Sequence, residues 1–435
     1  MPPSSDSPRR VAITGIGVVS PIGSSLDALR EALWAGQSGV KPLEWMAELP
    51  ERVHYGGEAW GFAGKIDDFG DLPKERKKYI RKAIKLMCRE TVMGLAAVEH
   101  AIQNAGGDEA LGDPERFGVA FGSDYMLTMP EEFEDSMAKC RESGDFRYDD
   151  WGSAGLAEMN PLWMLKYLPN MPASHVAITY DLRGPNNSLT LREASGVAAV
   201  REAAQTIARG HADRMVAGAT GTRLHPFKTV HAVQTEQLAD PTLEPAEASR
   251  PFDSSRTGMV VGEGAGAVVL EELESARARG ATIYGEVIGS GSSSVTDREL
   301  RGNPRQALEN AAKAALRDAG VDAVGHVNAN GLATPDADLQ EAKAIAASTG
   351  REDTPVVAPK SRFGNLGAAS GVVELACSLL ALEKGSLFPA INCPTPDPEC
   401  PVDASPAEGS DAGGSFLKLS VTPQGQAAAV VVRAV

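Results

Sequence analysis

A charged pair, Arg192-Glu193, stands where a helix of small residues is predicted to begin. A turn and a short strand precede the pair, and alanine and glycine dominate residues 194–199, so this helix can pack closely against a neighbour. Helix starts present free N–H groups and a positive potential, which stabilise a carboxylate. A glutamate in this place is usually only a cap or a partner of the helix dipole, although a carboxylate can also act as a general base. Burial would raise the pKa of Glu193 whereas the helix start and Arg192 would lower it, so residue types alone leave its charge open.

Thiols and imidazoles, the other groups that could do chemistry, are scattered along the chain. The five cysteines are an odd number without metal-type clustering. Cys88 and Cys377 lie among apolar helix residues and are predicted to pack, whereas Cys393 and Cys400 are predicted to be surface thiols of a proline-rich loop. This usage fits a reducing cytoplasm. The seven histidines match no motif, and His326, on a predicted strand, is expected in the core.

The composition excludes several functional classes. Of 435 residues, 43% are hydrophobic and 23% are charged, which is ordinary for a globular protein. A net charge of −16 argues against nucleic acid or an anionic membrane as the main partner. No apolar run reaches the roughly 20 residues that cross a bilayer, and residues 1–10 lack the apolar core of a signal peptide. We therefore expect a cytoplasmic protein.

The elements that must position these groups repeat along the chain. The first half is predicted to contain strands at 11–19, 117–122 and 214–218 and helices at 79–105 and 194–209. The second half follows the same order, with strands at 283–289 and 325–330 and helices at 304–319, 338–348 and 367–384. We expect a duplicated α/β fold with largely parallel strand pairing and with sites at strand ends and helix starts.

The predicted organisation is a single compact body with one main insertion. Residues 1–8 are expected to form a disordered tail, residues 9–275 the first half and residues 276–435 the second half. The insertion, at about 123–172, is rich in acids, methionine and tryptophan. Its methionines could line a tunnel or a partner surface, and an ordinary solvated cap is an equally good interpretation.

Four motifs, in the same order, resemble those of the elongating β-ketoacyl-acyl-carrier-protein synthases, and the resemblance covers nearly the full chain. They are the opening strand 10–21, the segment 160–172, the run Arg250-Pro251-Phe252-Asp253 with 262–266, and Pro359-Lys360-Ser361 with Gly364 and 367–369. The resemblance implies a thiolase-like fold, which is a duplicated five-layer α-β-α-β-α body and usually a dimer.

The same resemblance points to three substituted positions. In that family a cysteine at a helix start accepts an acyl chain from a carrier protein, and two histidines assist loss of CO2 from the malonyl unit. This chain has Glu193 at the position of the cysteine, and Asn330 and Asn365 at the positions of the histidines. A carboxylate is a poor acyl acceptor because the product would be a mixed anhydride, and asparagine does not titrate near neutrality. Ordinary condensation is therefore not expected.

Other family positions are partly kept. Lys360 and Glu341, a supporting charged pair in the family, are both present. Of the two threonines that contact the pantetheine arm, Thr334 is present and the other is Leu332. The glycine-rich loop near the carboxyl end appears as Thr422-Pro423-Gln424-Gly425, and its proline has no N–H to offer to an oxyanion hole.

Three functional interpretations follow from the resemblance. The first is a non-condensing subunit resembling the chain-length factors of type II polyketide systems, which pair with an active ketosynthase and shape the growing-chain tunnel. Those proteins usually have Gln at the cysteine position, so Glu193 is a departure. The second is an enzyme that acts on acyl-carrier-protein thioesters, with Glu193 as general base and Asn330 and Asn365 as oxyanion donors. The third, condensation with a relocated nucleophile at Cys88 or Cys377, has least support because no histidine pair accompanies either thiol.

The resemblance also implies partners. An acyl carrier protein would present its substrate on a phosphopantetheine arm, and we expect no metal and no other bound cofactor. A homodimer and a heterodimer with a cysteine-bearing ketosynthase fit the sequence equally well. Carrier proteins of such systems are acidic, so docking needs a local basic patch. The candidate is a basic run at the start of the first long helix, with a solvated helix face as the simpler alternative: Arg76, Lys77, Lys78, Arg81 and Lys82.

Overall fold

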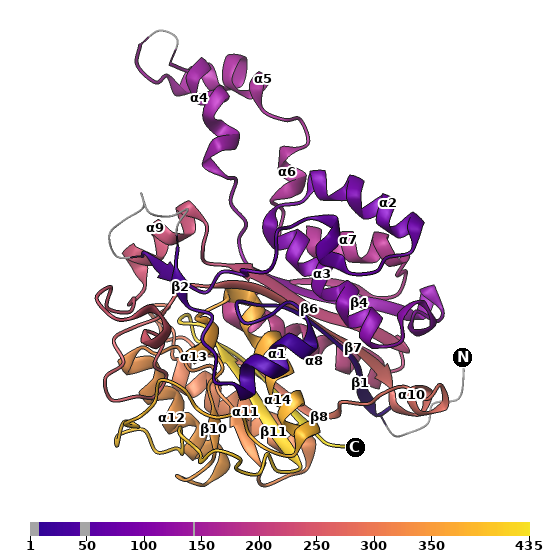
Figure 1. The fold of residues 1–435 in the computed structure, drawn as a ribbon, viewed down its shortest axis with the longest axis vertical. Coiled ribbons are helices and arrows are strands. Elements are labelled where there is room, and N and C mark those ends of the chain that lie inside the picture. The colour runs from indigo at the N-terminus through magenta and orange to yellow at the C-terminus, as the bar shows by residue number, and fades with distance from the viewer. Residues whose placement is uncertain (1–7, 44–52, 142–143) are drawn as a thin grey trace.

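A ten-stranded mixed sheet runs through the molecule, with helices packed against both of its faces (Figure 1). The computed structural model describes residues 8–43, 53–141 and 144–435. The expected tail, residues 1–8, lies outside the described residues apart from Pro8. The order of the strands is β10-β9-β11-β12-β8-β1-β7-β6-β4-β5, and a separate two-stranded sheet joins β2 (Lys41–Pro42) to β3 (Tyr55–Gly56).

The ten-stranded sheet is built from one five-strand arrangement used twice. In the first half, β7 (Glu263–Glu272) lies between β1 (Val11–Val19) and β6 (Arg214–Thr222) and runs antiparallel to both. Next to β6 follow β4 (Phe117–Ser123) and then β5 (Asn186–Thr190), each parallel to its neighbour. The second half repeats this order: β8 (Gly285–Ser294), β12 (Gln426–Arg433), β11 (Ser415–Val421), β9 (His326–Asn328) and β10 (Val356–Val357). Antiparallel pairing of β1 with β8 joins the halves.

This repeat confirms the predicted duplicated α/β fold but corrects the expected strand directions. The pairing is mixed rather than largely parallel, because β7 and β12 each run antiparallel to both of their neighbours. Only β4, β5, β9 and β10 have exclusively parallel partners.

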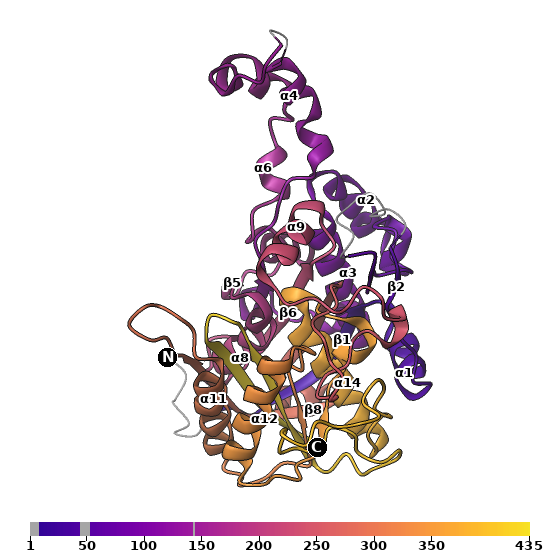
Figure 2. The ribbon, with the colours of Figure 1, turned by 90° about the vertical axis from the view of Figure 1, so that its left-hand side faces the viewer.

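The helices complete five layers, as the thiolase-like expectation required (Figures 1 and 2). Helices α3 (Arg89–Asn104) and α7 (Met171–Tyr180) cover the outer side of the first half-sheet. Helices α8 (Ser195–Ala208) and α14 (Ser370–Lys384) lie between the half-sheets, and both contact strands of each half. Helix α11 (Pro304–Ala319) covers the second half-sheet, with α12 (Pro335–Thr349) beside it. The remaining α-helices are short: α1 (Leu26–Trp34), α2 (Lys74–Ala83), α4 (Glu134–Lys139), α5 (Leu156–Glu158), α6 (Trp163–Lys166), α9 (Pro226–Thr235), α10 (Leu273–Ala278) and α13 (Lys360–Phe363).

Close approach of α3 to β1 depends on two glycines. A Cβ at Gly15 would lie 2.3 Å from the carbonyl oxygen of Ala101, and one at Gly17 would lie 2.0 Å from that of Ala97. Any larger residue would push the helix off the strand, which is buried along its whole length.

The predicted helix at 79–105 is two helices in the structure. Helix α2 ends at Ala83, a turn of 3₁₀ helix covers Ile84–Leu86, and α3 begins at Arg89. Extended backbone at Met87 and Cys88 separates them, because both side chains turn into the interior and are buried. The other predicted helices, and the strands at 11–19, 117–122, 214–218, 283–289 and 325–330, are present to within a few residues.

The insertion at 123–172 forms an arm that projects from the body (Figures 1 and 2). Helices α4, α5 and α6 lie along it, and the ring of Phe133 packs 6.1 Å from that of Trp151 and 6.3 Å from that of Trp163. The arm exposes many large apolar side chains: Met137, Phe146, Tyr148, Leu156, Leu162, Met164 and Leu165. Clustered apolar side chains at a surface are typical of protein contact sites, whereas scattered ones are ordinary.

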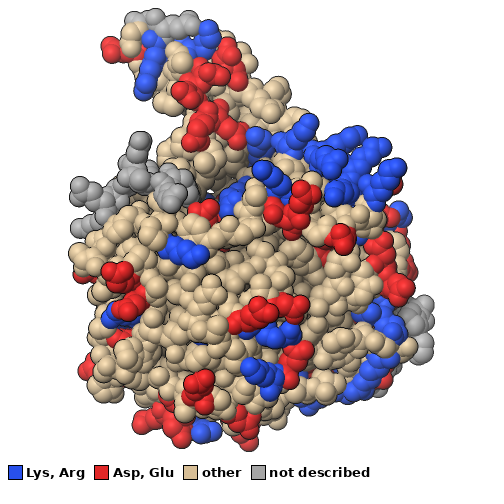
Figure 3. All heavy atoms as spheres, in the orientation of Figure 1, with Lys and Arg blue, Asp and Glu red and all other residues tan. Residues whose placement is uncertain are grey.

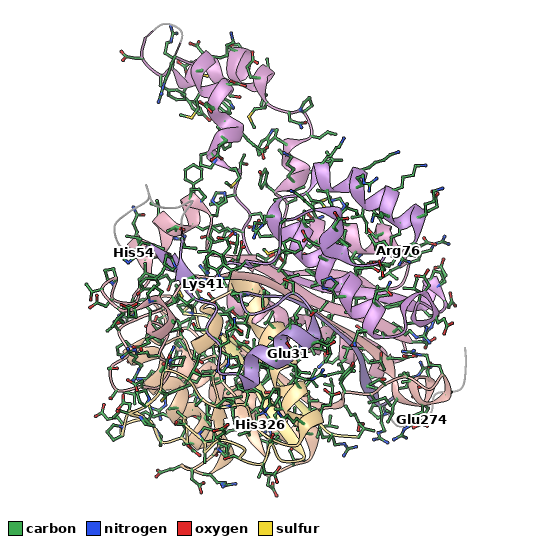
Figure 4. The ribbon with its side chains drawn as sticks, in the orientation of Figure 1. Glu31, Lys41, His54, Arg76, Glu274 and His326 are labelled. Carbon is green, nitrogen blue, oxygen red and sulfur yellow. The ribbon has the colours of Figure 1, made fainter. Side chains whose placement is uncertain are left out.

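The structure confirms the predicted burial of Cys88, Cys377 and His326, whereas the prediction of surface thiols at Cys393 and Cys400 is wrong. Cys88 and Cys377 are buried, and His326, labelled in Figure 4, is fully buried between the Ala412 carbonyl and the Ser378 hydroxyl. Cys393 and Cys400 are also buried rather than surface thiols, because their proline-rich loop folds back onto the apolar cluster of α11 and α12. No helix in the described part of the chain is long and apolar enough to cross a membrane.

Candidate active site

Two helix starts, one from each half, meet at the centre of the molecule. Glu193 lies in a 3₁₀ turn (Arg192–Ala194) that leads into α8, and Asn365 lies just before the turn (Gly367–Ala369) that leads into α14. The Nδ2 atom of Asn365 donates a hydrogen bond of 3.1 Å to Oε1 of Glu193. The amide oxygen of Asn365 accepts from the N–H of Gly367 at 3.0 Å and from the hydroxyl of Ser370 at 3.2 Å, which fixes the amide so that its NH2 group faces Glu193.

A buried arginine completes the surroundings of Glu193. Arg223 follows directly after β6, and its Nη2 atom donates to Oε1 of Glu193 in a short ion pair. Both side chains are only 3% exposed. The Nε atom of Arg192 lies 3.4 Å from the other carboxylate oxygen, and Oδ2 of Asp124 lies 3.8 Å from Arg223. Two guanidinium groups and an amide therefore surround one carboxylate.

These contacts determine the charge of Glu193. Burial alone would raise the pKa of this carboxyl, but the positive charges of Arg223 and Arg192 and the hydrogen bond from Asn365 outweigh it and lower the pKa to about 2. The pKa of Arg223 is raised by the same pairing, against the effect of its burial. Glu193 is thus a carboxylate throughout the neutral range, and a group with such a low pKa is a poor general base.

Asn330, Lys360 and Glu341 form a second group next to the first. Glu341 accepts hydrogen bonds from the backbone N–H groups of Asn330 at 2.6 Å and Gly331 at 2.7 Å. Lys360 donates to the carbonyl oxygen of Asn330 at 2.7 Å. Among the described contacts no hydrogen bond joins Asn330 to Glu193, so the structure brings Glu193 and Asn365 into contact and leaves Asn330 in the second group.

The expected charged pair of Lys360 with Glu341 is replaced by a different pairing. Lys360 forms its ion pair with Glu374 on α14, at 2.5 Å, and Lys418 on β11 binds the other oxygen of the same carboxylate. Lys418 also donates to the carbonyl of Ala329 at 3.2 Å. Burial lowers the pKa of Lys418 and raises that of Glu341, whose carboxylate is held by backbone N–H groups instead of a lysine.

The two remaining family positions are also described. Thr334 precedes α12 and is buried, and its hydroxyl has no hydrogen-bond partner in the described residues, whereas Leu332 packs into a small apolar cluster. The turn 422–425 closes a hairpin between β11 and β12, in which Gly425 donates to the carbonyl of Thr422 at 3.0 Å and Thr422 donates to that of Gln426 at 2.9 Å. These N–H groups are satisfied within the turn and offer nothing to an oxyanion.

Sequence reasoning missed Arg223, Glu374 and Lys418. A signal existed for each, because Glu374 and Lys418 interrupt otherwise apolar runs, and buried charges are rarely tolerated without partners. Arg223 follows a strand whose carboxyl end faces the centre, where ligand-binding residues of α/β folds gather. No cluster of metal-binding side chains occurs in the described part of the chain.

Comparison with known proteins places these features in context. Models of the β-ketoacyl synthase N-terminal and C-terminal domains match residues 8–276 and 284–394. A 3-oxoacyl-acyl-carrier-protein synthase 2 of Coxiella burnetii is 33% identical over 407 residues, covering 92% of each chain. The structure titled the ishigamide ketosynthase/chain length factor superposes with a TM-score of 0.81 at 26% identity, covering 99% of this chain and all of that one. A type II polyketide ketosynthase, solved with its acyl-carrier protein, superposes with a TM-score of 0.80 at 29% identity, covering 98% of this chain and all of that one.

Proposed function

This chain belongs to the β-ketoacyl synthase family, and we propose that it is a non-condensing member, a subunit like a chain-length factor that pairs with a cysteine-bearing ketosynthase. The observation that carries the proposal is the buried ion pair of Glu193 with Arg223. Family chemistry needs a thiolate at this helix start, and here a carboxylate is neutralised in place by a guanidinium and an amide.

Three further observations support the absence of condensation. Asn330 and Asn365 replace groups that must exchange protons, and asparagine cannot do so near neutrality. The N–H groups of Thr422 and Gly425, in the 422–425 turn, are bound within the turn itself, and Pro423 has none. All five cysteines are buried, and burial raises the pKa of Cys88 and Cys377 to about 12, so neither supplies a thiolate at neutral pH.

The alternative, an enzyme with Glu193 as general base, is not favoured by the geometry. A base must have a free lone pair directed at its substrate and a pKa near the working pH. Glu193 has a pKa of about 2 and is 3% exposed. Arg223 and Asn365 bind one carboxylate oxygen, and the other is buried 3.4 Å from Nε of Arg192, so the low pKa and the burial are what make it a poor base.

Pairing with a second subunit is supported by an exposed sheet edge. Strand β5 ends the sheet and has β4 as its one neighbour, and most of its residues are exposed or half-buried. An open edge with unpaired backbone N–H and C=O groups can accept a strand from another chain. The apolar side chains of the projecting arm offer a second contact surface.

We propose that a carrier protein binds to this assembly and that its phosphopantetheine arm reaches Thr334. Basic side chains gather over α2 (Figure 3), and Lys78, Arg81 and Lys82 are exposed there. Arg76, labelled in Figure 4, is not available, because it binds Asp108 at 2.5 Å and lies over the ring of Tyr180. An acidic carrier would be attracted to the exposed lysines and arginine.

The test is the intact mass of malonyl- and acyl-loaded carrier proteins. We expect the purified chain to leave both unchanged, and we expect it to increase product formation when mixed with a type II ketosynthase that keeps the cysteine and both histidines. Loss of CO2 or of the acyl group with the chain alone, abolished by Glu193→Ala, would overturn the proposal in favour of an enzyme.

A further inference from the structure

Arg362, on α13, is the one buried lysine or arginine of the described residues that has no carboxylate partner. Its side chain is among the largest that are fully buried, and the residue is only 1% exposed. No Asp or Glu acts on it within the described part of the chain. Each of the other buried cations binds a carboxylate: Arg223 binds Glu193, Arg256 binds Asp397, Lys228 binds Glu90, and Lys360 and Lys418 share Glu374.

Neutral groups of the protein meet part of the Arg362 guanidinium. Its Nη2 atom donates to the carbonyl oxygen of Leu33 at 3.1 Å and to that of Pro389 at 2.5 Å. Its Nη1 atom lies 3.5 Å from the hydroxyl oxygen of Ser361, and the guanidinium carbon lies 5.1 Å from the centre of the Phe388 ring. These groups stabilise a cation but carry no full negative charge. The Nε–H group is buried and has no acceptor in the described residues.

Arg362 keeps its charge in these surroundings. Burial lowers the pKa of its guanidinium to about 10, which is still well above neutral pH. A buried charge without an opposite charge is retained only at a cost in stability. Binding of an anion next to the guanidinium would remove that cost.

A small, partly open cavity lies against Arg362. Its volume is about 20 Å³, which is room for one guest of about the size of a water molecule. Arg362, Ser361 and Cys393 are the polar side chains that line it, and the rest of the wall is apolar and includes Phe388 and Ala404. Burial raises the pKa of the Cys393 thiol to about 12, so this group brings no negative charge at neutral pH. The described wall thus presents one positive charge and no carboxylate.

We propose that this cavity binds one small monovalent anion, a halide such as chloride, and that the Nε–H group of Arg362 donates to it. The unpaired guanidinium accounts for the charge of the ligand, and the volume of the cavity accounts for its size and excludes large organic anions. A water molecule would satisfy the Nε–H group but would leave the positive charge uncompensated.

The proposed anion lies behind the candidate active site. Arg362 stands in the chain between Lys360, which binds Glu374, and Asn365, which binds Glu193. An anion on Arg362 would therefore stabilise the segment that positions both of these side chains. The inference does not rest on the proposed function, because it concerns ion binding to this chain alone.

The first test is thermal unfolding of the full chain in potassium chloride and in potassium gluconate at equal ionic strength, measured by calorimetry. Gluconate is too large for the cavity, and a ligand that binds only the folded state raises the unfolding temperature. Arg362→Met removes the charge and Nε but keeps an unbranched side chain. We expect replacement of gluconate by chloride to raise the unfolding temperature of the wild type by at least about 1 °C more than that of Arg362→Met. General salt effects act on both proteins and cancel in this comparison.

Two further variants make the test specific. Arg351→Met, the same change at an exposed arginine, should keep the chloride effect of the wild type. Ala404→Leu, which fills the cavity and leaves Arg362 in place, should lose it, and this variant serves if Arg362→Met does not fold. Circular dichroism establishes that each variant is folded. A chloride effect that is equal in the wild type and in Arg362→Met or Ala404→Leu, or that is lost in Arg351→Met, would overturn the proposal.

The second test locates the ion directly and needs no variant. Crystals of the wild-type chain soaked in sodium bromide should show an anomalous-difference peak in contact with Nε of Arg362, because bromide replaces chloride and scatters anomalously. A cavity without such a peak would overturn the proposal. Neither test contains a carrier protein or a ketosynthase, so failure of the ketosynthase mixing experiment leaves both results unchanged.

Discussion

The amide of Asn365 binds the carboxylate of Glu193 across the centre of the molecule, at 3.1 Å and between residues 172 positions apart. One residue precedes the helix α14 and the other precedes α8, the two helices of the middle layer. The contact shows that both positions are used to hold a charge in place. Arg223 supplies the opposite charge, so the centre is a neutral, buried network.

Glu193 should contribute a distinct part of the acid sensitivity of folding. The pKa of Glu193 is about 2 in the folded chain against an ordinary value of 4.5, so the folded state binds its proton less readily than the unfolded state. The contribution of the ionised Glu193 to the free energy of unfolding is therefore full above pH 4.5 and is lost as the pH falls from 4.5 towards 2. Urea denaturation of the wild type and Glu193→Gln at several pH values measures this. Their difference in unfolding free energy should be constant above pH 5 and shrink below 4.5, and a constant difference down to pH 2.5 would contradict the assignment.

Removal of Arg223 should be strongly destabilising. Arg223→Ala leaves a buried carboxylate without its cation, which costs about 3–5 kcal/mol of unfolding free energy. The double variant Glu193→Ala/Arg223→Ala removes both charges and should recover part of that loss. Denaturation of the two single variants and the double variant forms the thermodynamic cycle, and strictly additive effects would show that the two charges do not interact.

Restoring a thiol alone should not restore condensation. Glu193→Cys places a thiol beside Arg223, but Asn330 and Asn365 still cannot exchange protons, and the N–H groups of Thr422 and Gly425 are still bound within the turn. Acyl transfer to the new cysteine and formation of a β-ketoacyl carrier are read separately by mass. We expect no β-ketoacyl product, and its appearance would mean that the asparagines are not the limiting substitutions.

Glu374 should matter more for stability than Lys418. Glu374→Gln leaves two buried ammonium groups, those of Lys360 and Lys418, facing a neutral amide, and should cost at least about 3 kcal/mol. Lys418→Met removes one cation and leaves the Lys360–Glu374 pair intact, so its cost should be clearly smaller. Thermal and urea denaturation of the two variants side by side decide the order, and the reverse order would refute the pairing.

Carrier docking on α2 should depend on charge. Reversal of Lys78 and Lys82 to Glu should weaken binding of an acidic carrier by about tenfold at low salt, with the difference shrinking as salt increases. Reversal of Lys313 and Arg317 on α11, on the other side of the body, provides the matched control. Carrier binding that is unchanged by the first pair would exclude α2 as the docking site.

Much of the fold could be predicted from the sequence because the buried strands are apolar runs. The run at 11–19 forms β1 to the residue, and the helix at 304–319 ends at Gly320, which has the left-handed φ of 65° that glycine favours. The break between α2 and α3 was missed because Met87 and Cys88 are as apolar as a helix interior. Burial of Cys393 and Cys400 depends on a distant loop contact that local composition does not encode.

The sequence predicted residues of the candidate site but not the ion pairs that they form. Motif position identified Glu193 and Asn365, and the structure brings them into contact. The partner of Glu193, Arg223, is 30 residues away, directly after β6, and the partner of Lys360 is Glu374 rather than Glu341. Pairing between distant residues follows from packing of the layers, and spacing along one sequence does not specify it.

The position of β1 in the sheet has a consequence for synthesis. Strand β1 is synthesised before both of its partners, β7, where Val11 lies opposite Glu272, and β8, where Val11 lies opposite Val287. At about 5–20 residues per second, β1 waits roughly 13–52 s for its first partner strand. Glu193 is synthesised before β6 and β7, so the half-sheet beside it is still incomplete when this residue is made. The nascent chain therefore carries an unpaired apolar strand until β7 has been made, and this interval is when it most needs protection from aggregation.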